Sequence, residues 1–133
     1  MSRGLKNCNP GNIRRSAGTY KGEVRPSRDP AFKQFETMAW GYRAIFVLLD
    51  IYRTRHGLRT IAEMIGRWAP PTENRTQTYI RTVAQRTGIA ADRALDTRDR
   101  ATMIPIAAAI SLVENGTAAE MQEVEKGWEL FVD

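Results

Sequence analysis

Apolar residues recur at helical spacing along most of the chain. In residues 38–57 they lie three and four positions apart, and Gly57 is of the type that commonly ends a helix. In residues 60–69, Thr60 and Glu63 have the spacing of a capping box, and two prolines follow. These patterns predict two helices.

The same spacing returns in residues 74–88. Asn74 is a favourable N-cap residue at the start of this segment, and Gly88 is a favourable stop at its end. A further short stretch, 90–95, is expected to form one helical turn. The pattern thus predicts a third long helix and a brief fourth element.

Two more helices are predicted in the last third of the chain. The segment 97–116 is strongly apolar, and its Pro105 is tolerated if the regular helix starts close before it and otherwise implies a kink. Thr117 and Glu120 repeat the capping-box spacing and are expected to open the final helix.

The beginning of the chain has a different pattern. Residues 3–35 are rich in Gly, Pro, Asn, Ser and Arg, with short β-compatible pieces around 12–16 and 32–35 and glycines at the expected turns. We therefore expect a mainly α fold with a small hairpin or loop region near the N-terminus. About five helices would surround a central apolar helix in a single domain, 1–133.

The sequence shows no segment for membrane insertion or secretion. No apolar run approaches the roughly 20 residues that a membrane span needs, and the N-terminus lacks the apolar core of a standard signal peptide.

Composition narrows the possible site chemistry. Cys8 and His56 are the only residues of their kinds, which excludes an intrachain disulfide and any Cys-rich or multi-histidine metal site. Glycine loops that bind phosphate are absent as well, so no metal or cofactor is expected.

The net charge of +5 favours an anionic partner such as nucleic acid, acidic lipid or the bacterial wall. Residues 58–88 have a suitable length for a helix-turn-helix motif. However, the Trp-Ala-Pro-Pro sequence at 68–71 is a poor turn for that motif, so nucleic acid is disfavoured. Steep salt-dependent binding to DNA would be needed to revive this interpretation.

Glu114 is the candidate for acid chemistry. The segment 103–113 has little polar surface on any side, so it is expected at the centre of the domain with Glu114 leaving the core at its C-terminal end. Burial and the negative end of the helix dipole both raise a carboxyl pKa, which suits a general acid. The alternative is a last-turn residue that faces water.

Several sequence blocks carry a resemblance to a known family. The blocks are Asn9–Arg14, Trp40–Ala44 and Trp68–Pro71, with the pairs Glu73-Asn74 and Tyr79-Ile80. They resemble small phage and prophage proteins that are found among lysozyme-like sequences and are often described as virion structural proteins. Their order is also similar to that of flagellar-type peptidoglycan glucosaminidases and lytic transglycosylases.

One feature departs from those enzymes. In them, the helix that ends in the catalytic glutamate precedes the Asn-rich segment, whereas here only eight residues precede Asn9. The segment 104–116 resembles the missing helix but stands near the other end of the chain. We infer a circularly permuted lysozyme-like fold in which Glu114 meets the Asn9–Arg14 segment.

The resemblance implies a peptidoglycan glycosidase, a muramidase or lytic transglycosylase, with Glu114 as general acid. Residues with suitable chemistry to seat the glycan are Asn9, Asn12, Trp68, Glu73 and Tyr79. Each of the first four also has a structural interpretation. In that interpretation the asparagines serve merely to form a turn, Trp68 anchors the core, and Glu73 begins a helix.

A second carboxylate is required by most glycosidases. Glu36, Asp29 and Glu73 are possible, but the sequence does not place one beside Glu114. The absence of an obvious second acid favours a lytic transglycosylase or substrate assistance by the N-acetyl group of the sugar.

The resemblance also implies partners and a location. Peptidoglycan and other phage virion proteins are the expected partners, and the expected location is the phage virion, or the host cytoplasm before release to the wall. The alternative function is a non-catalytic virion structural or assembly protein that keeps the fold without the activity.

Overall fold

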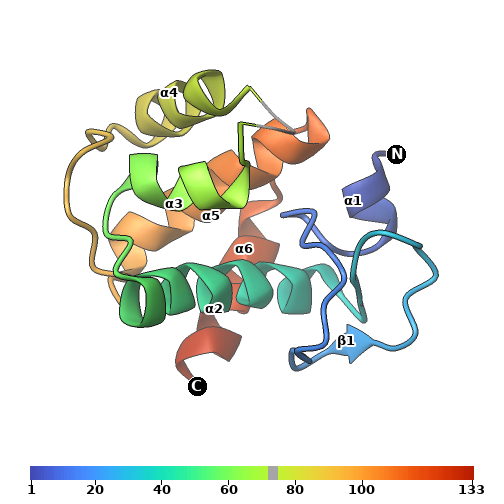
Figure 1. Cartoon of the computed structure of the whole chain (residues 1–133). Coiled ribbons are helices and arrows are strands. Elements are labelled where there is room, and N and C mark those ends of the chain that lie inside the picture. Colours follow the sequence, from blue (N-terminus) through green and yellow to red (C-terminus); the bar gives the residue numbers. More distant parts are fainter. Residues whose placement is uncertain (72–74) are drawn as a thin grey trace.

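The computed structural model describes residues 1–71 and 75–133 of the chain, and the described residues form six helices and two short strands (Figure 1). The expectation of a mainly helical protein with a small β element is confirmed. The helices are α1 (Arg3–Lys6), α2 (Met38–His56), α3 (Ile61–Trp68), α4 (Thr76–Thr87), α5 (Arg100–Asn115) and α6 (Met121–Val132). None of the described helices combines the length and hydropathy that crossing a bilayer requires.

The β element is smaller than expected and partly displaced. Strand β1 (Glu23–Val24) pairs antiparallel with β2 (Gln34–Phe35), so the predicted piece at 32–35 is confirmed at its end. The predicted piece at 12–16 is confirmed only in part, because its β pairing is limited to an isolated antiparallel bridge between Arg14 and Phe32. Hydrogen bonds from Lys33 N–H to Ile13 C=O and from Arg15 N–H to Ala31 C=O flank this bridge, and the tight turn that Asn9 holds comes directly before it.

Helices α2 and α6 lie against each other and form one side of the core. The ring centroids of Phe46 and Trp128 are 5.0 Å apart in an edge-to-face arrangement, and Phe131 stacks on Phe46 at 6.0 Å. Such aromatic pairs add stabilisation beyond the burial of their area. The last helix is therefore fixed to the longest one by its aromatic side chains.

Helix α5 contacts four other helices: α1, α2, α4 and α6. Met103, Ala107 and Ile110 are fully buried along it, as the apolar pattern predicts. Pro105 occupies the sixth position, where it removes one intrahelical hydrogen bond near the solvent-exposed first turn. The helix ends at Gly116 with φ 68°, so the predicted stop after Glu114 is confirmed.

The predicted ends of the other helices are largely correct. Gly57 and Gly88 both adopt the left-handed conformation that ends a helix, with φ 66° and 72°. The Thr60 hydroxyl accepts a hydrogen bond from the backbone N–H of Glu63 at 3.1 Å. Asn74, the predicted N-cap of α4, lies outside the described residues.

One local prediction holds only in part and another is wrong. Residues 90–93 form a single hydrogen-bonded turn, with Arg93 N–H donating to Ala90 C=O at 3.1 Å, but no helix follows. The backbone there also bonds to the start of α3, through Ala62 N–H to Ala91 C=O and Leu95 N–H to Arg59 C=O. The Thr117 capping box is not used, since α6 begins at Met121 with Glu120 as its N-cap residue.

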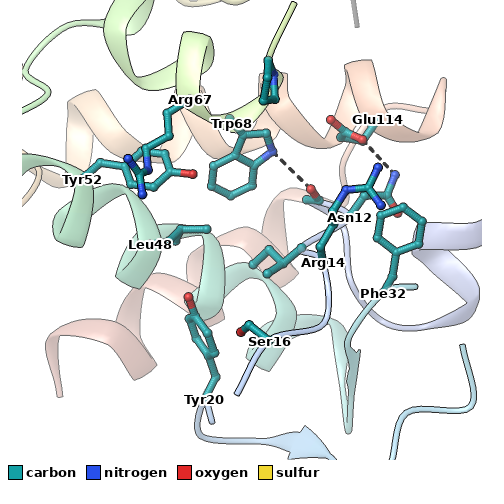
Figure 2. A pocket seen from close by; sticks show the side chains of 13 residues that line it. Asn12, Arg14, Ser16, Tyr20, Phe32, Leu48, Tyr52, Arg67, Trp68 and Glu114 are labelled. Carbon is teal, nitrogen blue, oxygen red and sulfur yellow. Dashed lines mark hydrogen bonds between the residues drawn. The ribbon is translucent and has the colours of Figure 1, made fainter. Parts of the chain in front are cut away.

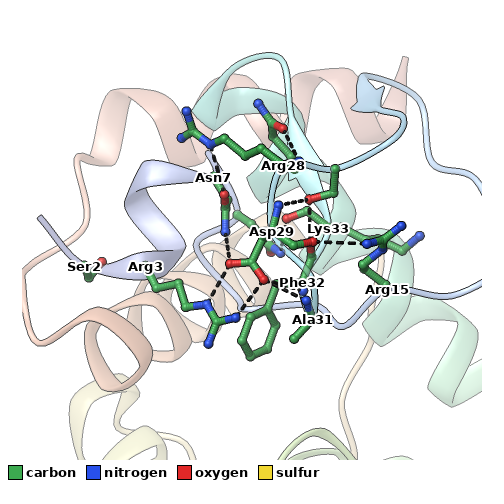
Figure 3. Close-up of polar contacts among 12 residues, drawn as sticks. Ser2, Arg3, Asn7, Arg15, Arg28, Asp29, Ala31, Phe32 and Lys33 are labelled. Atoms are coloured by element: carbon green, nitrogen blue, oxygen red, sulfur yellow. Dashed lines mark hydrogen bonds and ion pairs between the residues drawn. The ribbon is translucent and has the colours of Figure 1, made fainter.

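Hydrogen bonds hold the N-terminal segment together and attach it to the end of α5. Figure 3 shows the Asp29 carboxylate at the centre of one network, where it accepts hydrogen bonds from Arg3 Nε at 2.6 Å and Asn7 Nδ2 at 3.0 Å. Ser2 Oγ donates to Asn115 Oδ1 at 2.7 Å, and Asn115 Nδ2 donates to Pro10 C=O at 2.9 Å. The residues around Asn12 are thereby held against the end of α5.

Candidate active site

Glu114 lies in the last turn of α5, and its half-buried carboxylate accepts two side-chain hydrogen bonds. Asn12 Nδ2 donates to Oε1 at 2.9 Å, and the Tyr79 hydroxyl donates to Oε2 at 2.9 Å. The first of these bonds is drawn in Figure 2. The structure thus brings together three of the residues named from the sequence, from the N-terminal loop, α4 and α5.

The surroundings of Glu114 act on its proton in opposite directions. Burial raises the pKa of the carboxyl, while the hydrogen bonds from Asn12 and Tyr79 and the charge of Arg14 lower it, and the balance is a raised pKa. Burial and the neighbouring Glu114 also raise the pKa of Tyr79, so its hydroxyl stays a donor. The carboxyl therefore holds a proton more readily than a free glutamate, yet its ionised form has two ready donors.

A cleft of about 360 Å³ opens beside the carboxylate and is here named the main cleft. Figure 2 shows aromatic rings, arginine side chains and Glu114 around the same opening. Its lining residues are Gly11, Asn12, Ile13, Arg14, Ser16, Tyr20, Phe32, Leu48, Tyr52, Arg67, Trp68, Pro70 and Glu114. Flat rings with interspersed polar groups suit a sugar chain.

A second hollow of about 220 Å³ lies on the α4 side of Glu114 and is here named the side pocket. It is lined by Arg75, Thr78, Tyr79, Thr82, Val113 and Glu114. Glu114 is the one residue that lines both hollows. A chain-like ligand that crosses the carboxyl would therefore find space on either side of it.

Asn12 has an unusual conformation that its side chain explains. Its φ is +48°, in the left-handed region that asparagine tolerates better than most residues. Its backbone N–H donates to Asn9 C=O at 3.0 Å, which closes the turn, while its Nδ2 reaches Glu114. Its Oδ1 is buried without a hydrogen-bond partner, beside Gly4 of α1.

Asn9 lies in the same turn but does not line the main cleft. Its side chain is fully buried, with Oδ1 accepting from Ile13 N–H at 3.0 Å and Nδ2 donating to Ile13 C=O and Lys33 C=O. Of the two alternatives left open by the sequence, this geometry matches the turn-forming one. Asn9 shapes the loop that presents Asn12.

Trp68 packs on the core and also lines the main cleft. Its ring packs edge-to-face on Tyr52, with centroids 6.1 Å apart, and also forms part of the cleft wall. Its Nε1 donates to Gly11 C=O at 3.2 Å. A Cβ at Gly11 would come within 2.6 Å of the indole, so glycine is needed for the loop to approach the ring this closely.

Neither of the two described candidates for a second acid, Asp29 and Glu36, lines the main cleft or the side pocket. Asp29 is held by Arg3 and other donors, which keep its pKa well below the usual range. Glu36 is exposed and lines neither hollow. Glu73 lies outside the described residues. Among the described residues, Glu114 is the only carboxyl that lines the main cleft or the side pocket.

Several cleft residues were not identified from the sequence. Arg14 and Arg67 bring positive charge to the main cleft, and Tyr52 and Tyr20 bring aromatic surface. Arg67 stacks over the Tyr52 ring at 5.4 Å. Arg14 stands inside a block that was recognised, but nothing in helical spacing distinguishes Tyr52 and Arg67 from ordinary core and surface positions.

The described residues contain no group of three or more histidine, cysteine or acidic side chains that could hold a metal ion. The groups present at the cleft are a carboxyl, its two hydrogen-bond donors and the surrounding rings and arginines. A carboxyl with a raised pKa in a cleft is suited to giving a proton to a bound ligand.

No protein-family model matches the chain. The chain is similar to Protein P5 of Pseudoalteromonas phage PM2, with 36% identity over 131 residues. The matched region covers 96% of this chain and 81% of that protein. The similarity therefore extends over nearly all of the structure described above, including the loop with Asn12 and the end of α5.

Proposed function

The chain belongs to the family of Protein P5 from Pseudoalteromonas phage PM2, and from that premise we propose that it is a phage-derived enzyme that cleaves peptidoglycan glycan strands. The proposed activity is that of a muramidase or lytic transglycosylase, which cuts between N-acetylmuramic acid and N-acetylglucosamine. One observation carries the proposal: the Glu114 carboxyl, its pKa raised by burial, is oriented by Asn12 and Tyr79 at the edge of the main cleft.

Glu114 acts as the general acid. Its protonated form gives the proton to the oxygen of the glycosidic bond, and that bond breaks as the leaving sugar becomes an alcohol. The resulting carboxylate accepts hydrogen bonds from Asn12 and Tyr79, which stabilise the charge left behind. These two residues therefore favour proton release without removing the raised pKa that supplies the proton.

The single described carboxyl at the cleft favours substrate assistance. The carbonyl oxygen of the N-acetyl group attacks the anomeric carbon as the glycosidic bond breaks. The C6 hydroxyl of the same sugar then displaces it and returns its proton to Glu114, which leaves a 1,6-anhydro end. Hydrolysis by water would give a reducing end instead, and would call for a base such as Glu73.

The main cleft offers suitable contacts for the glycan. The Trp68 ring provides a flat surface against which a sugar ring can stack, and Asn12 provides a polar group next to the acid. Tyr79 bonds to Glu114 from the side pocket. The net charge of +5 adds attraction to the anionic bacterial wall. Glu73 remains a proposed glycan contact.

A lysozyme-like single domain, 1–133, in circularly permuted order is the fold that goes with this function. The contact of Asn12 with Glu114 supports it, because permutation requires the N-terminal asparagine segment to meet the helix that ends in the acid. The bonds from Asn115 to Pro10 and from Ser2 to Asn115 strengthen that meeting.

The activity is tested by incubating the protein with purified peptidoglycan sacculi and identifying the new ends by mass spectrometry. The proposal expects soluble muropeptides that end in muramic acid, with 1,6-anhydro ends if the reaction is substrate-assisted. Release of free stem peptides with intact glycan would contradict the proposal and point to a peptidase or amidase.

A non-catalytic virion protein is the second candidate, favoured by the relationship to a phage protein. It would be found in assembled particles, would contact other virion proteins, and would release nothing from sacculi. Finding the protein in virions together with wall cleavage would support an enzyme carried by the particle. Finding it there with no cleavage at any protein concentration would support the structural role.

A further inference from the structure

The main cleft adjoins another hollow at its end away from Glu114 (Figure 2). Ser16 and Tyr20 also line a further hollow of about 460 Å³, here named the cationic groove. In Figure 2 these two residues lie at the end of the main cleft away from Glu114. The cationic groove therefore continues the cleft beyond the sugar contacts proposed above.

Lys21, Arg43 and Arg55 give this groove its charge. Among the described residues, no carboxyl side chain lines it. Lys21 and Arg55 are exposed, while Arg43 is half-buried beside the ring of Trp40 at 5.9 Å. Three cations along one hollow with no facing acid make it a site for an anionic group.

Arg43 is the strongest indication of a ligand. Its Nε is buried and has no hydrogen-bond partner, which is an unfavourable condition for a charged donor. Burial also lowers the pKa of the guanidinium, and no neighbouring carboxylate offsets that effect. Because Nε is shielded from solvent, an incoming carboxylate would form its charge-assisted hydrogen bond with the part of the Arg43 guanidinium that lines the groove.

The groove is not purely polar. Val47 and Ile51, one turn apart on α2, line it together with Tyr20. A polyphosphate or nucleic-acid backbone would present only charge to these side chains. A short peptide that carries methyl groups and free carboxylates would match both the apolar and the cationic parts.

We propose that the cationic groove binds the stem peptide of peptidoglycan through its carboxylates, with Arg43 and Arg55 as the principal contacts. This inference rests on the proposed function, because the peptide hangs from the muramic acid that the main cleft would hold. Binding of the peptide fixes the register of the glycan, so that the bond presented to Glu114 is the one beside a peptide-bearing sugar.

The first test compares cleavage of intact glycan strands with cleavage of strands whose peptides an amidase has removed. The protein should cut the intact strands about tenfold faster, as expected for one charge-assisted contact. Arg55→Gln should remove most of that preference by slowing cleavage of the intact strands. Arg53→Gln, a neighbouring exposed arginine of α2 outside the groove, is the matched control and should change neither rate.

A binding measurement separates the contact from the chemistry. Glu114→Gln should bind a disaccharide-tetrapeptide about tenfold more tightly than the same disaccharide without peptide. Adding Arg43→Gln should abolish this difference. If that double variant unfolds, which a thermal melt would reveal, Glu114→Gln with the exposed Arg55→Gln carries the same test.

The outcomes are distinct. Cleavage of both kinds of strand at one rate, unaffected by Arg55→Gln, overturns the inference and leaves the glycosidase intact. A wild-type protein that cuts neither strand overturns the proposed function itself. Displacement of the peptide-bearing disaccharide by short DNA at lower concentration than by free stem peptide would also overturn the inference, in favour of a phosphate ligand.

Discussion

The central feature at the scale of single residues is the balance around the Glu114 carboxyl. Burial favours the protonated acid, and two donors, Asn12 Nδ2 and the Tyr79 hydroxyl, favour the ionised one. A general acid needs both, since it must hold the proton before the reaction and release it during the reaction. Each donor can be removed separately, which makes the balance testable.

Tyr79→Phe removes one donor and nothing else from the ring. Because the hydrogen bond from Tyr79 lowers the pKa of Glu114, its loss should raise that pKa and move the alkaline limb of the pH–rate profile upward. Cleavage below the pKa should fall about tenfold, in line with one hydrogen bond to a charged group. An alkaline limb that stays in place would show that this limb does not report Glu114.

Glu114→Gln should stabilise the protein at neutral pH. The folded-state pKa of Glu114 is raised, so its ionised form destabilises the fold once the pH exceeds that pKa, and the penalty disappears as the pH falls to the unfolded value near 4.3. The gain should appear as a higher melting temperature of the variant. Melting curves at pH 7 and pH 4 check it, and a gain equal at both would exclude the ionisation as its cause.

The sequence could predict which residues take part better than how each one does so. Asn9 and Asn12 look alike in the sequence. The side chain of Asn9 is buried and bonds to backbone groups of Ile13 and Lys33, whereas the side chain of Asn12 bonds to Glu114. The difference depends on Lys33, twenty or more residues away, and on a left-handed φ at Asn12. Neither is visible in local spacing.

At the scale of elements, the loop that carries Asn12 lies directly on α2. Gly41 makes this possible, because a Cβ there would overlap the carbonyl oxygen of Cys8 and come within 2.6 Å of Pro10 Cδ. This close contact sets the distance between the loop backbone at Cys8 and Pro10 and the α2 backbone at Gly41. The position of Asn12 relative to Glu114 therefore depends on a glycine on another element.

Gly41→Ala should destabilise the protein by about 1–3 kcal/mol, the usual effect of overpacking against a rigid neighbour. Gly66→Ala is the matched control, since Gly66 is also helical but has open space where its Cβ would be. That change should stabilise the fold by about 0.5–1 kcal/mol through helix propensity. Urea unfolding measures both, and equal effects would contradict the close approach of the loop.

Element boundaries were predictable where one residue type decides the backbone. Gly57, Gly88 and Gly116 ended their helices as expected because each adopts a positive φ. The capping box at Thr117 was not predictive, since a box stabilises a helix end only weakly and α6 begins at Met121 without a side-chain cap. The short helix α1 has too few residues to leave a periodic pattern.

At the scale of the whole molecule, hydrogen bonds fold the N-terminal segment onto itself and attach it to the end of α5. Asp29 holds Arg3 and Asn7 on one side, and Asn115 holds Ser2 and Pro10 on the other. Helical periodicity alone indicates the mainly α class, but these long-range bonds are set by side-chain partners that no periodicity reveals. Residues of this segment line the main cleft together with residues of α2, α3 and α5.

Asp29→Asn should make the free energy of unfolding depend less steeply on pH in the acid range. The pKa of Asp29 is lowered by Arg3 and by other donors, so its contribution is present above the unfolded value near 3.9 and is lost as the pH falls below it. The variant should be less stable than the wild type at pH 7, and the difference should shrink below pH 4. Urea unfolding across this range checks the trend, and a constant difference would point to packing instead of charge.

The most direct test of the central claim is the rate at which Glu114→Gln solubilises purified sacculi, compared with the wild type. Glu129→Gln, an exposed glutamate on α6, is the control for loss of one charge. The account predicts that Glu114→Gln, folded by its melting curve, loses at least about a hundredfold in rate, the usual contribution of a positioned acid, while Glu129→Gln keeps its rate. Cleavage by Glu114→Gln at the wild-type rate would contradict it.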